Sequence, residues 1–164
     1  MAKINRHHYK KINNEWKVFK TTTLHFNKIP YNKETILEYI EKIKTILTPK
    51  FLSKKYKKEN EKNPLYGHCY HTTQAMYFLL NTDTLETFTA VDYRGDQHWW
   101  LKDKNDNSII DVTADQYYVV NKQPPYDKGK IKSWYGWKNR PHIRTFKLIM
   151  KLQPKSKLSR LTNN

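Results

Sequence analysis

The sequence contains a single cysteine, Cys69, so the chain cannot close an internal disulfide. Proteins without disulfides are typical of reducing compartments, and charged residues interrupt the first twenty positions, where a secretion signal would need an apolar run. No apolar run reaches the roughly 18 to 20 residues that cross a bilayer, which excludes a membrane-spanning helix. We therefore expect a cytoplasmic location and no membrane partner.

Acidic residues are also scarce. The chain has 31 Lys and Arg against 15 Asp and Glu, a net charge of +16, and residues 128–164 contain eleven Lys or Arg and no acid. This excess predicts an anionic partner, either nucleic acid or an acidic protein, although a solvated, like-charged tail would have the same composition. The candidate nucleic-acid-binding residues are Lys130, Lys132, Lys138, Arg140 and Arg144.

Aromatic residues are plentiful, because five Trp, twelve Tyr and six Phe occur in 164 residues. They compensate for a hydrophobic fraction of only 37%, so the chain can bury one core. We expect a single α+β domain over residues 1–154, with a basic N-terminal arm, and a flexible basic tail over 155–164. Trp134 and Trp137 lie in the acid-free segment, where they either stack on nucleic-acid bases or close the core.

Apolar side chains recur at helical spacing in three segments. A first helix is predicted over 32–48, with Asn32 as its N-cap and Pro49 ending it. A second helix begins at Cys69 and continues through the apolar residues that follow, and a third begins near Pro141.

Three strand-like runs follow the second helix, at about 85–94, 97–102 and 108–113, and predict an antiparallel meander. A further short strand is expected around 117–120. The predicted fold class is therefore α+β, with helices packed on a small antiparallel sheet.

The register of this meander decides which side chains meet. The Gly-Asp pair at 95–96 suits a two-residue turn that pairs Tyr93 with His98. A four-residue loop at 103–106 would then place His98 opposite Asp111. A five-residue loop would send Asp111 to the other face of the sheet.

A cysteine nucleophile needs a nearby imidazole and a third group that orients the imidazole. Cys69 opens the second helix, where unpaired backbone N–H groups and the helix dipole favour a thiolate. His98 and Asp111 lie on consecutive predicted strands, so these three are the candidate catalytic residues. The candidate substrate-binding residues are His68, Tyr93, Trp99 and Trp100.

The order of helix cysteine, strand histidine and strand aspartate resembles the transglutaminase-like and arylamine N-acetyltransferase-like branch of papain-type cysteine enzymes. The resemblance implies a papain-like core in which Cys69 attacks a carbonyl, His98 acts as base and then acid, and Asp111 fixes the His98 tautomer. It also implies that the Cys69 N–H contributes to an oxyanion hole. The expected function is that of a cysteine-dependent acyltransferase or hydrolase acting on an anionic or nucleic-acid-associated substrate.

A second resemblance covers a longer part of the chain, from about Tyr66 to Leu152. The motifs Gly-His-Cys-Tyr at 67–70, His-Trp-Trp at 98–100 and Asp-Val-Thr-Ala-Asp-Gln at 111–116 are similar to those of a family of small proteins encoded by tailed phages. Pro124-Pro125-Tyr126 and Gly136-Trp137-Lys138 belong to the same likeness. It implies a viral origin, with action in the host cytoplasm or the virion.

Two other readings remain open. A lone cysteine and a histidine beside tryptophans can simply be packed core groups, in which case the basic chain would be a non-enzymatic nucleic-acid-binding protein. A zinc site could draw on His68, Cys69, His71, His98 and Asp111. No paired Cys or His spacing supports that, so we predict no metal and no cofactor.

Overall fold

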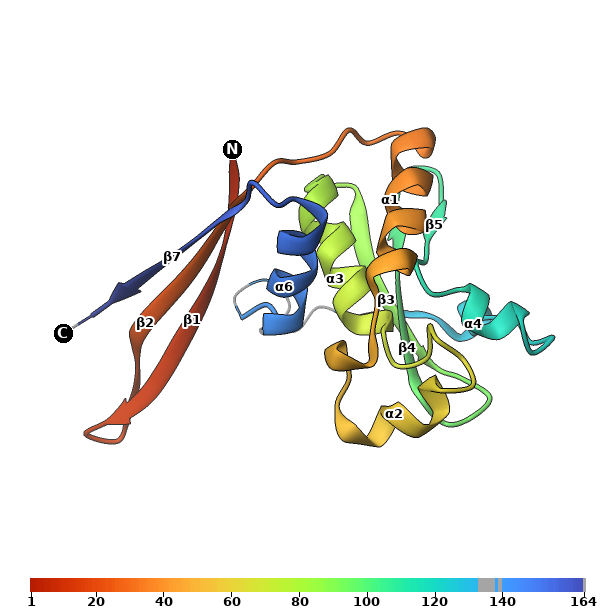
Figure 1. Cartoon of the computed structure of the whole chain (residues 1–164), viewed down its shortest axis with the longest axis horizontal. Coiled ribbons are helices and arrows are strands. Elements are labelled where there is room, and N and C mark those ends of the chain that lie inside the picture. The colour runs from red at the N-terminus through yellow and green to blue at the C-terminus, as the bar shows by residue number, and fades with distance from the viewer. Residues whose placement is uncertain (133–137, 139, 164) are drawn as a thin grey trace.

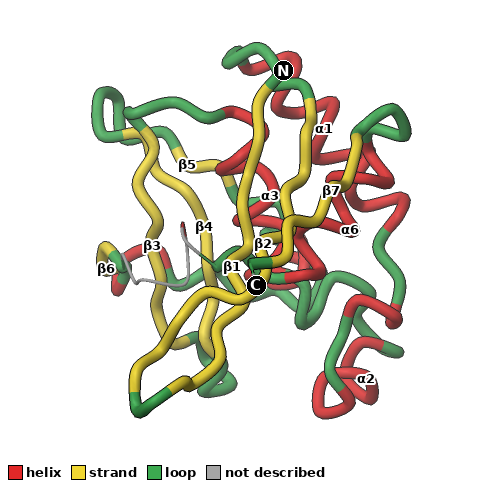
Figure 2. The backbone as a smooth tube through the Cα atoms, turned by 90° about the vertical axis from the view of Figure 1, so that its left-hand side faces the viewer, coloured by secondary structure: helices red, strands yellow, loops and turns green. Residues whose placement is uncertain are grey.

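The computed structural model describes residues 1–132, 138 and 140–163 and shows a mixed α+β chain with two small antiparallel sheets (Figures 1 and 2). The first sheet, here called sheet A, has the strand order β1-β2-β7, and sheet B has the order β5-β4-β3-β6. The coarse fold class predicted from the sequence is confirmed. Sheet A consists of β1 (Ala2–Ile12), β2 (Glu15–Phe26) and β7 (Lys157–Thr162), and sheet B of β3 (Leu85–Val91), β4 (Gln97–Asp103), β5 (Ile109–Ile110) and β6 (Lys130–Ile131).

The helices lie between and around the two sheets (Figure 1). They are α1 (Lys33–Ile46), α2 (Lys54–Asn60), α3 (Cys69–Leu80), α4 (Asp115–Tyr118) and α6 (Ile143–Leu152), with 3-10 turns at Pro49–Phe51 and Tyr126–Lys128. The three helices predicted from periodicity are confirmed as α1, α3 and α6. Asn32 caps α1 as expected, because its Oδ1 accepts the Thr35 N–H at 2.8 Å.

The strand expected around 117–120 is wrong, because α4 occupies this position. The N–H of Gln116 donates to the Thr113 carbonyl and that of Tyr117 to the Ala114 carbonyl, both at 3.0 Å, so the backbone turns instead of extending. This turn points the buried Tyr117 side chain at the carboxylate of Asp92, to which its hydroxyl donates at 2.9 Å.

The N-terminal arm is a β-hairpin, and the segment expected to be a flexible tail carries a strand. Asn13 and Asn14 have φ of 51° and 65°, the left-handed conformation that a tight hairpin turn requires. Residues 157–162 form β7, which pairs with β2 from Lys20↔Thr162 to His25↔Lys157. The free edge of β2 therefore orders a segment that has no apolar stripe of its own.

The order of the meander is as predicted, but both loops are longer. Val91 pairs with Gln97 and Ala90 with His98, because the Asp92 carboxylate accepts the N–H groups of Arg94 and Asp96 and closes a wider turn. The pairing of Tyr93 with His98 is therefore wrong.

In the second loop, Lys102 pairs with Ile109 rather than with Asn107, so the loop is two residues longer than predicted. The Asp103 carboxylate accepts the Asn105 N–H at 2.8 Å within this loop. A slip of two residues leaves every side chain on its original face, whereas a slip of one would exchange the faces. Asp111 thus stays on the face that carries His98.

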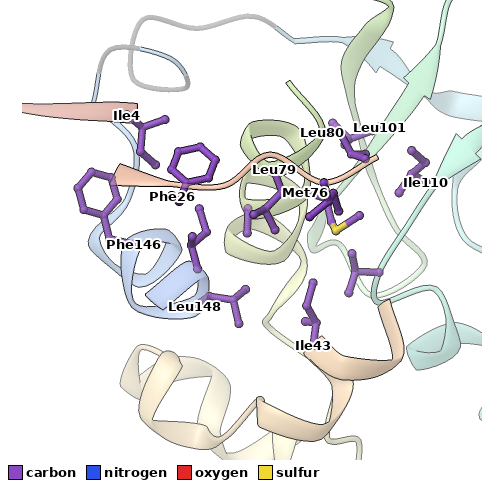
Figure 3. Packing of buried hydrophobic residues seen from close by; sticks show 14 of the residues in the cluster. Ile4, Phe26, Ile43, Met76, Leu79, Leu80, Leu101, Ile110, Phe146 and Leu148 are labelled. Atoms are coloured by element: carbon purple, nitrogen blue, oxygen red, sulfur yellow. The ribbon is translucent and has the colours of Figure 1, made fainter. Parts of the chain in front are cut away.

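One continuous apolar core joins the two sheets through α3 and α6 (Figure 3). Ile4 and Phe26 of sheet A meet Phe146 of α6, and on the far side of α3 the core ends at Leu101 and Ile110 of sheet B. Burying a side chain of this size contributes about 1.5–3 kcal/mol. The core therefore fixes α3, whose first residue is Cys69, against the strand that carries His98.

Candidate active site

Cys69 is the first residue of α3, and the residues before it shape a tight entry. Gly67 has φ of +86°, and a Cβ at this position would lie 2.9 Å from the Tyr56 Cβ, so both conformation and space require glycine. His68 is the N-cap residue but its side chain makes no capping hydrogen bond. The first N–H groups of α3 are therefore not used by a cap. The Cys69 sulfur is half-buried and lies 3.6 Å from the Gln97 carbonyl oxygen, next to His98.

His98 and Asp111 form a direct pair. The His98 Nε2 lies 2.7 Å from the Asp111 Oδ2, and the two side chains are only 1% and 2% exposed. Nε2 is thus taken by the carboxylate, and among the described residues Nδ1 has no oxygen or nitrogen partner. This arrangement leaves Nδ1 for the sulfur of Cys69.

The Asp111 carboxylate is held from two further directions. Its Oδ2 also accepts the hydroxyl of Tyr126 at 2.7 Å, and its Oδ1 accepts the Thr113 N–H at 3.2 Å. Burial and the neighbouring Asp111 raise the pKa of Tyr126, so its hydroxyl stays protonated and continues to donate. Sequence reasoning assigned Tyr126 no role, and the Pro-Pro-Tyr motif was the only signal that could have drawn attention to it.

The charge of His98 follows from these interactions. Burial alone would lower its pKa, but hydrogen bonds and charge interactions with Asp111 and Cys69 outweigh burial and raise the pKa to about 10. The imidazole is therefore cationic at neutral pH, between a carboxylate on one side and a thiol on the other. A neighbouring imidazolium stabilises the thiolate, which is the nucleophilic form of cysteine.

A cavity of about 290 Å³ opens beside the sulfur and is lined by Cys69, His98, Trp99, Arg94 and Arg144 among others. The Arg94 guanidinium is fixed in its wall, because it pairs with Asp92 at 3.2 Å and lies 4.5 Å from the centre of the Tyr66 ring. Its positive charge is therefore already compensated.

Arg144 differs from Arg94 because no carboxylate forms an ion pair with it within the described part of the chain. Its positive charge lowers the pKa of nearby histidines. Burial and then Arg144 lower the pKa of both His68 and His142 to about 4, and burial lowers the pKa of His71 well below its ordinary value. Arg144 is thus an uncompensated cation that lines the same cavity as Cys69, and it interacts with three histidines that stay neutral.

The structure separates the four candidate substrate-binding residues. Trp99 lines the cavity and packs edge-on against Tyr70, with ring centres 5.3 Å apart. Trp100 is buried behind the site, where it stacks on the His98 ring at 5.7 Å. His68 is fully buried and bonded to His71 at 2.9 Å, so it is a packing residue and not a wall of the cavity. Tyr93 is exposed on the β3–β4 loop, outside the cavity lining.

The candidate nucleic-acid-binding residues also fall in different places. Lys130 and Lys132 lie at the β6 edge of sheet B, and Lys138 lies 5.8 Å from the Tyr77 ring centre. Arg140 is exposed near Arg6, and Arg144 lines the cavity of Cys69. The aromatic segment 133–137, which includes Trp134 and Trp137, lies outside the described residues.

Within residues 1–132, 138 and 140–163, no group of three His, Cys, Asp or Glu side chains could hold a metal ion. None of the described helices is long and apolar enough to span a membrane. Comparison with protein-family models, with curated proteins and with solved structures finds no match for this chain.

Proposed function

We propose that this protein is a cysteine-dependent acyltransferase or hydrolase whose nucleophile is Cys69. The observation that carries the proposal is the buried His98–Asp111 pair at 2.7 Å, whose free ring nitrogen is left for a thiol at the start of α3. A packed, inert cysteine would not need an imidazole beside it that a buried carboxylate orients.

In the first step the Cys69 thiolate attacks a carbonyl carbon, and a carbon–sulfur bond forms. The backbone N–H of Cys69, at the start of α3, stabilises the negative charge that develops on the carbonyl oxygen. The His98 imidazolium then gives its proton to the leaving group as the bond to that group breaks. The product is a thioester on Cys69 and a neutral His98.

In the second step water or an amine acceptor displaces the thioester. Neutral His98 accepts a proton from the attacking group, the carbon–sulfur bond breaks, and the thiolate–imidazolium pair is restored. Asp111 holds Nε2 throughout, so Nδ1 keeps its direction toward the sulfur. Tyr126 and the Thr113 N–H keep the Asp111 carboxylate in place.

The substrate class follows from Arg144. An uncompensated guanidinium in the cavity favours an acyl group that carries a carboxylate or phosphate, and Arg binds both through two parallel hydrogen bonds. We therefore propose an anionic acyl donor. The helix-start Cys69 with His98 and Asp111 beside it supports a transglutaminase-like or papain-like core. We also propose that the chain is a phage protein that acts in the reducing cytoplasm of its host.

The test is acylation of the purified protein by p-nitrophenyl acetate and by the p-nitrophenyl monoester of succinate. We expect an acyl adduct on Cys69 by intact mass, and release of p-nitrophenol several-fold faster with the anionic ester. Cys69→Ser and His98→Ala should remove the adduct. An equal yield of adduct in His98→Ala, or none in the folded parent, would contradict the proposal.

A matched pair of arginine variants tests the substrate class. Arg144→Gln should abolish the preference for the succinate ester and leave acetate transfer nearly unchanged. Arg140→Gln removes the same charge at an exposed position outside the cavity lining and should preserve the preference. If both variants lose it equally, the preference arises from overall charge and not from the cavity.

A further inference from the structure

The pairing register of sheet A places a row of cations on one face. Arg6 lies opposite Thr22 and Thr22 opposite Arg160, while Lys10 lies opposite Lys17. Directly paired residues share a face, and so do alternate residues along a strand. The basic face is defined by Arg6, His8, Lys10, Lys17, Lys20 and Arg160.

Acidic residues are almost missing from this sheet. The three strands contain eight Lys or Arg and one acid, Glu15, which lies beside the turn and 3.9 Å from Lys17. The hairpin end that carries Lys10 and Lys17 points away from the helices (Figure 1), whereas the opposite end of the same face buries Ile4 and Leu24 in the core. In the view of Figure 2, sheet A lies nearest the viewer, in front of the helices.

The positive charges on this face repel one another, and the pKa of His8 shows the effect. Burial and then the charges of Lys20, Arg6, Arg140 and Arg160 lower the pKa of His8, because protonation would add a further positive charge to this group. Like charges on neighbouring strands destabilise a sheet. An anionic partner that bound the face would offset this cost.

An aromatic ring lies among the cations. A bulge in β2 between its pairings at Val18 and Lys20 turns Phe19 toward this face, where the Lys10 ammonium lies 5.3 Å from the ring centre and the His8 ring 6.3 Å away. Cations in a row with an aromatic ring between them are the combination that holds the backbone and a base of single-stranded nucleic acid.

We infer that the basic face of sheet A binds single-stranded nucleic acid through its phosphates. Alternate residues on a strand lie about 6.6–6.8 Å apart, so the face presents a linear series of charges to a linear polyanion. This surface combines the N-terminal hairpin with β7 and shares Arg140 alone with the five candidate nucleic-acid-binding residues predicted from the sequence. Arg140 extends it at the end nearest α6.

The test is fluorescence anisotropy of a labelled, mixed-sequence single-stranded oligonucleotide bound by the full chain. The triple variant Lys10→Gln, Lys20→Gln, Arg160→Gln should raise the Kd at least about tenfold. It should also flatten the plot of log Kd against log salt by about 0.7 for each phosphate that the variant no longer neutralises. The matched control is Lys54→Gln, Lys57→Gln, Lys58→Gln, which removes three exposed charges on α2.

The control variant should bind with nearly the parent Kd and the parent salt dependence. Equal losses in the two triple variants would overturn the inference, because net charge alone would then explain binding. So would tighter binding of a duplex of the same sequence, or binding to vesicles containing phosphatidylserine without binding to the oligonucleotide. Neither triple variant touches Cys69, so its acylation should be unchanged in both, and failure of one proposal leaves the other testable.

Discussion

The cavity of Cys69 and the basic face of sheet A treat charge in opposite ways. Most charges in the cavity wall have partners, because His98 pairs with Asp111 and Arg94 with Asp92, and Arg144 is the exception. On the basic face, exposed and half-buried cations stand beside other cations, and Glu15 is the one acid of the three strands. A buried charge needs a partner within the fold because it has lost its water, whereas an exposed charge is solvated and stays free to bind a partner in solution. The first region therefore suits chemistry and the second suits association.

The two regions are physically connected. The Arg6 guanidinium donates to the Pro141 carbonyl at 2.7 Å, just before α6, and the next residue, His142, donates its N–H to the Gln74 Oε1 of α3 at 2.9 Å. Gln74 also accepts the Thr145 hydroxyl at 2.6 Å. A chain of hydrogen bonds thus runs from the basic face to the helix that begins with Cys69.

The largest effect that we expect is a loss of stability in mild acid, which arises from the neutral histidines near the Cys69 cavity and not from the basic face. His68 has a folded pKa of about 4, below the unfolded value of about 6.5, so the unfolded state binds more protons between these values. The free energy of unfolding should therefore fall as pH drops from 7 to 5, by about 2 kcal/mol for His68 alone and by less for the half-buried His142. Urea denaturation at the two pH values measures this.

His98 counters this trend only in part. Its raised pKa stabilises the fold fully below pH 6.5, and that contribution is lost progressively as pH rises from 6.5 toward 10, so it grows by about 1 kcal/mol between pH 7 and 5, less than His68 loses. His142→Asn is the informative variant, since Asn keeps an N-cap acceptor for the Arg144 N–H and removes one titrating group. It should show a smaller acid loss than the parent, and a stability that is flat from pH 7 to 5 would refute the account.

A smaller effect tests whether the Asp111 carboxylate depends on its hydrogen bond from Tyr126. Tyr126→Phe removes one hydroxyl from the carboxylate and leaves the ring packed against Trp100, with ring centres 5.1 Å apart. We expect acylation of Cys69 to slow by roughly tenfold, because the carboxylate is left without one charge-assisted hydrogen bond of about 1.5 kcal/mol. Stopped-flow release of p-nitrophenol measures the rate.

Binding of the oligonucleotide should be the same in Tyr126→Phe as in the parent, because the substitution changes the cavity and leaves the basic face of sheet A unchanged. Tyr31→Phe, which removes a hydroxyl from the Asp103 carboxylate outside the cavity lining, is the matched control and should acylate at nearly the parent rate. A Tyr126→Phe rate equal to that of the control would mean that the Asp111 carboxylate needs no support from this hydroxyl.

Local patterns in the sequence were enough to predict the helices and the order of the meander. Helices α1, α3 and α6 each have apolar residues at helical spacing, and this information is contained within one segment. The register of the meander was not predictable, because it depends on Asp92 and Asp103 accepting backbone N–H groups inside the loops. The face of Asp111 was kept only because the error was two residues.

Sheet A was missed for a different reason. Every residue of β7 is exposed, so the strand has no apolar alternation and depends on backbone pairing with β2. The Asn13-Asn14 pair was a usable signal for the hairpin turn, but the high charge of the first twenty residues concealed it. The places of Tyr126 and Arg144 beside the site depend on tertiary packing, which no local pattern encodes.

The most direct test of the account is the rate of Cys69 alkylation by iodoacetamide as a function of pH. The His98 imidazolium persists well above neutral pH, so the parent should react quickly between about pH 6 and 8. His98→Ala should react at least about tenfold more slowly at pH 7, with Asp111→Asn between the two. Identical rates in the three proteins, or alkylation of the parent only after unfolding, would contradict a coupled Cys69–His98–Asp111 site.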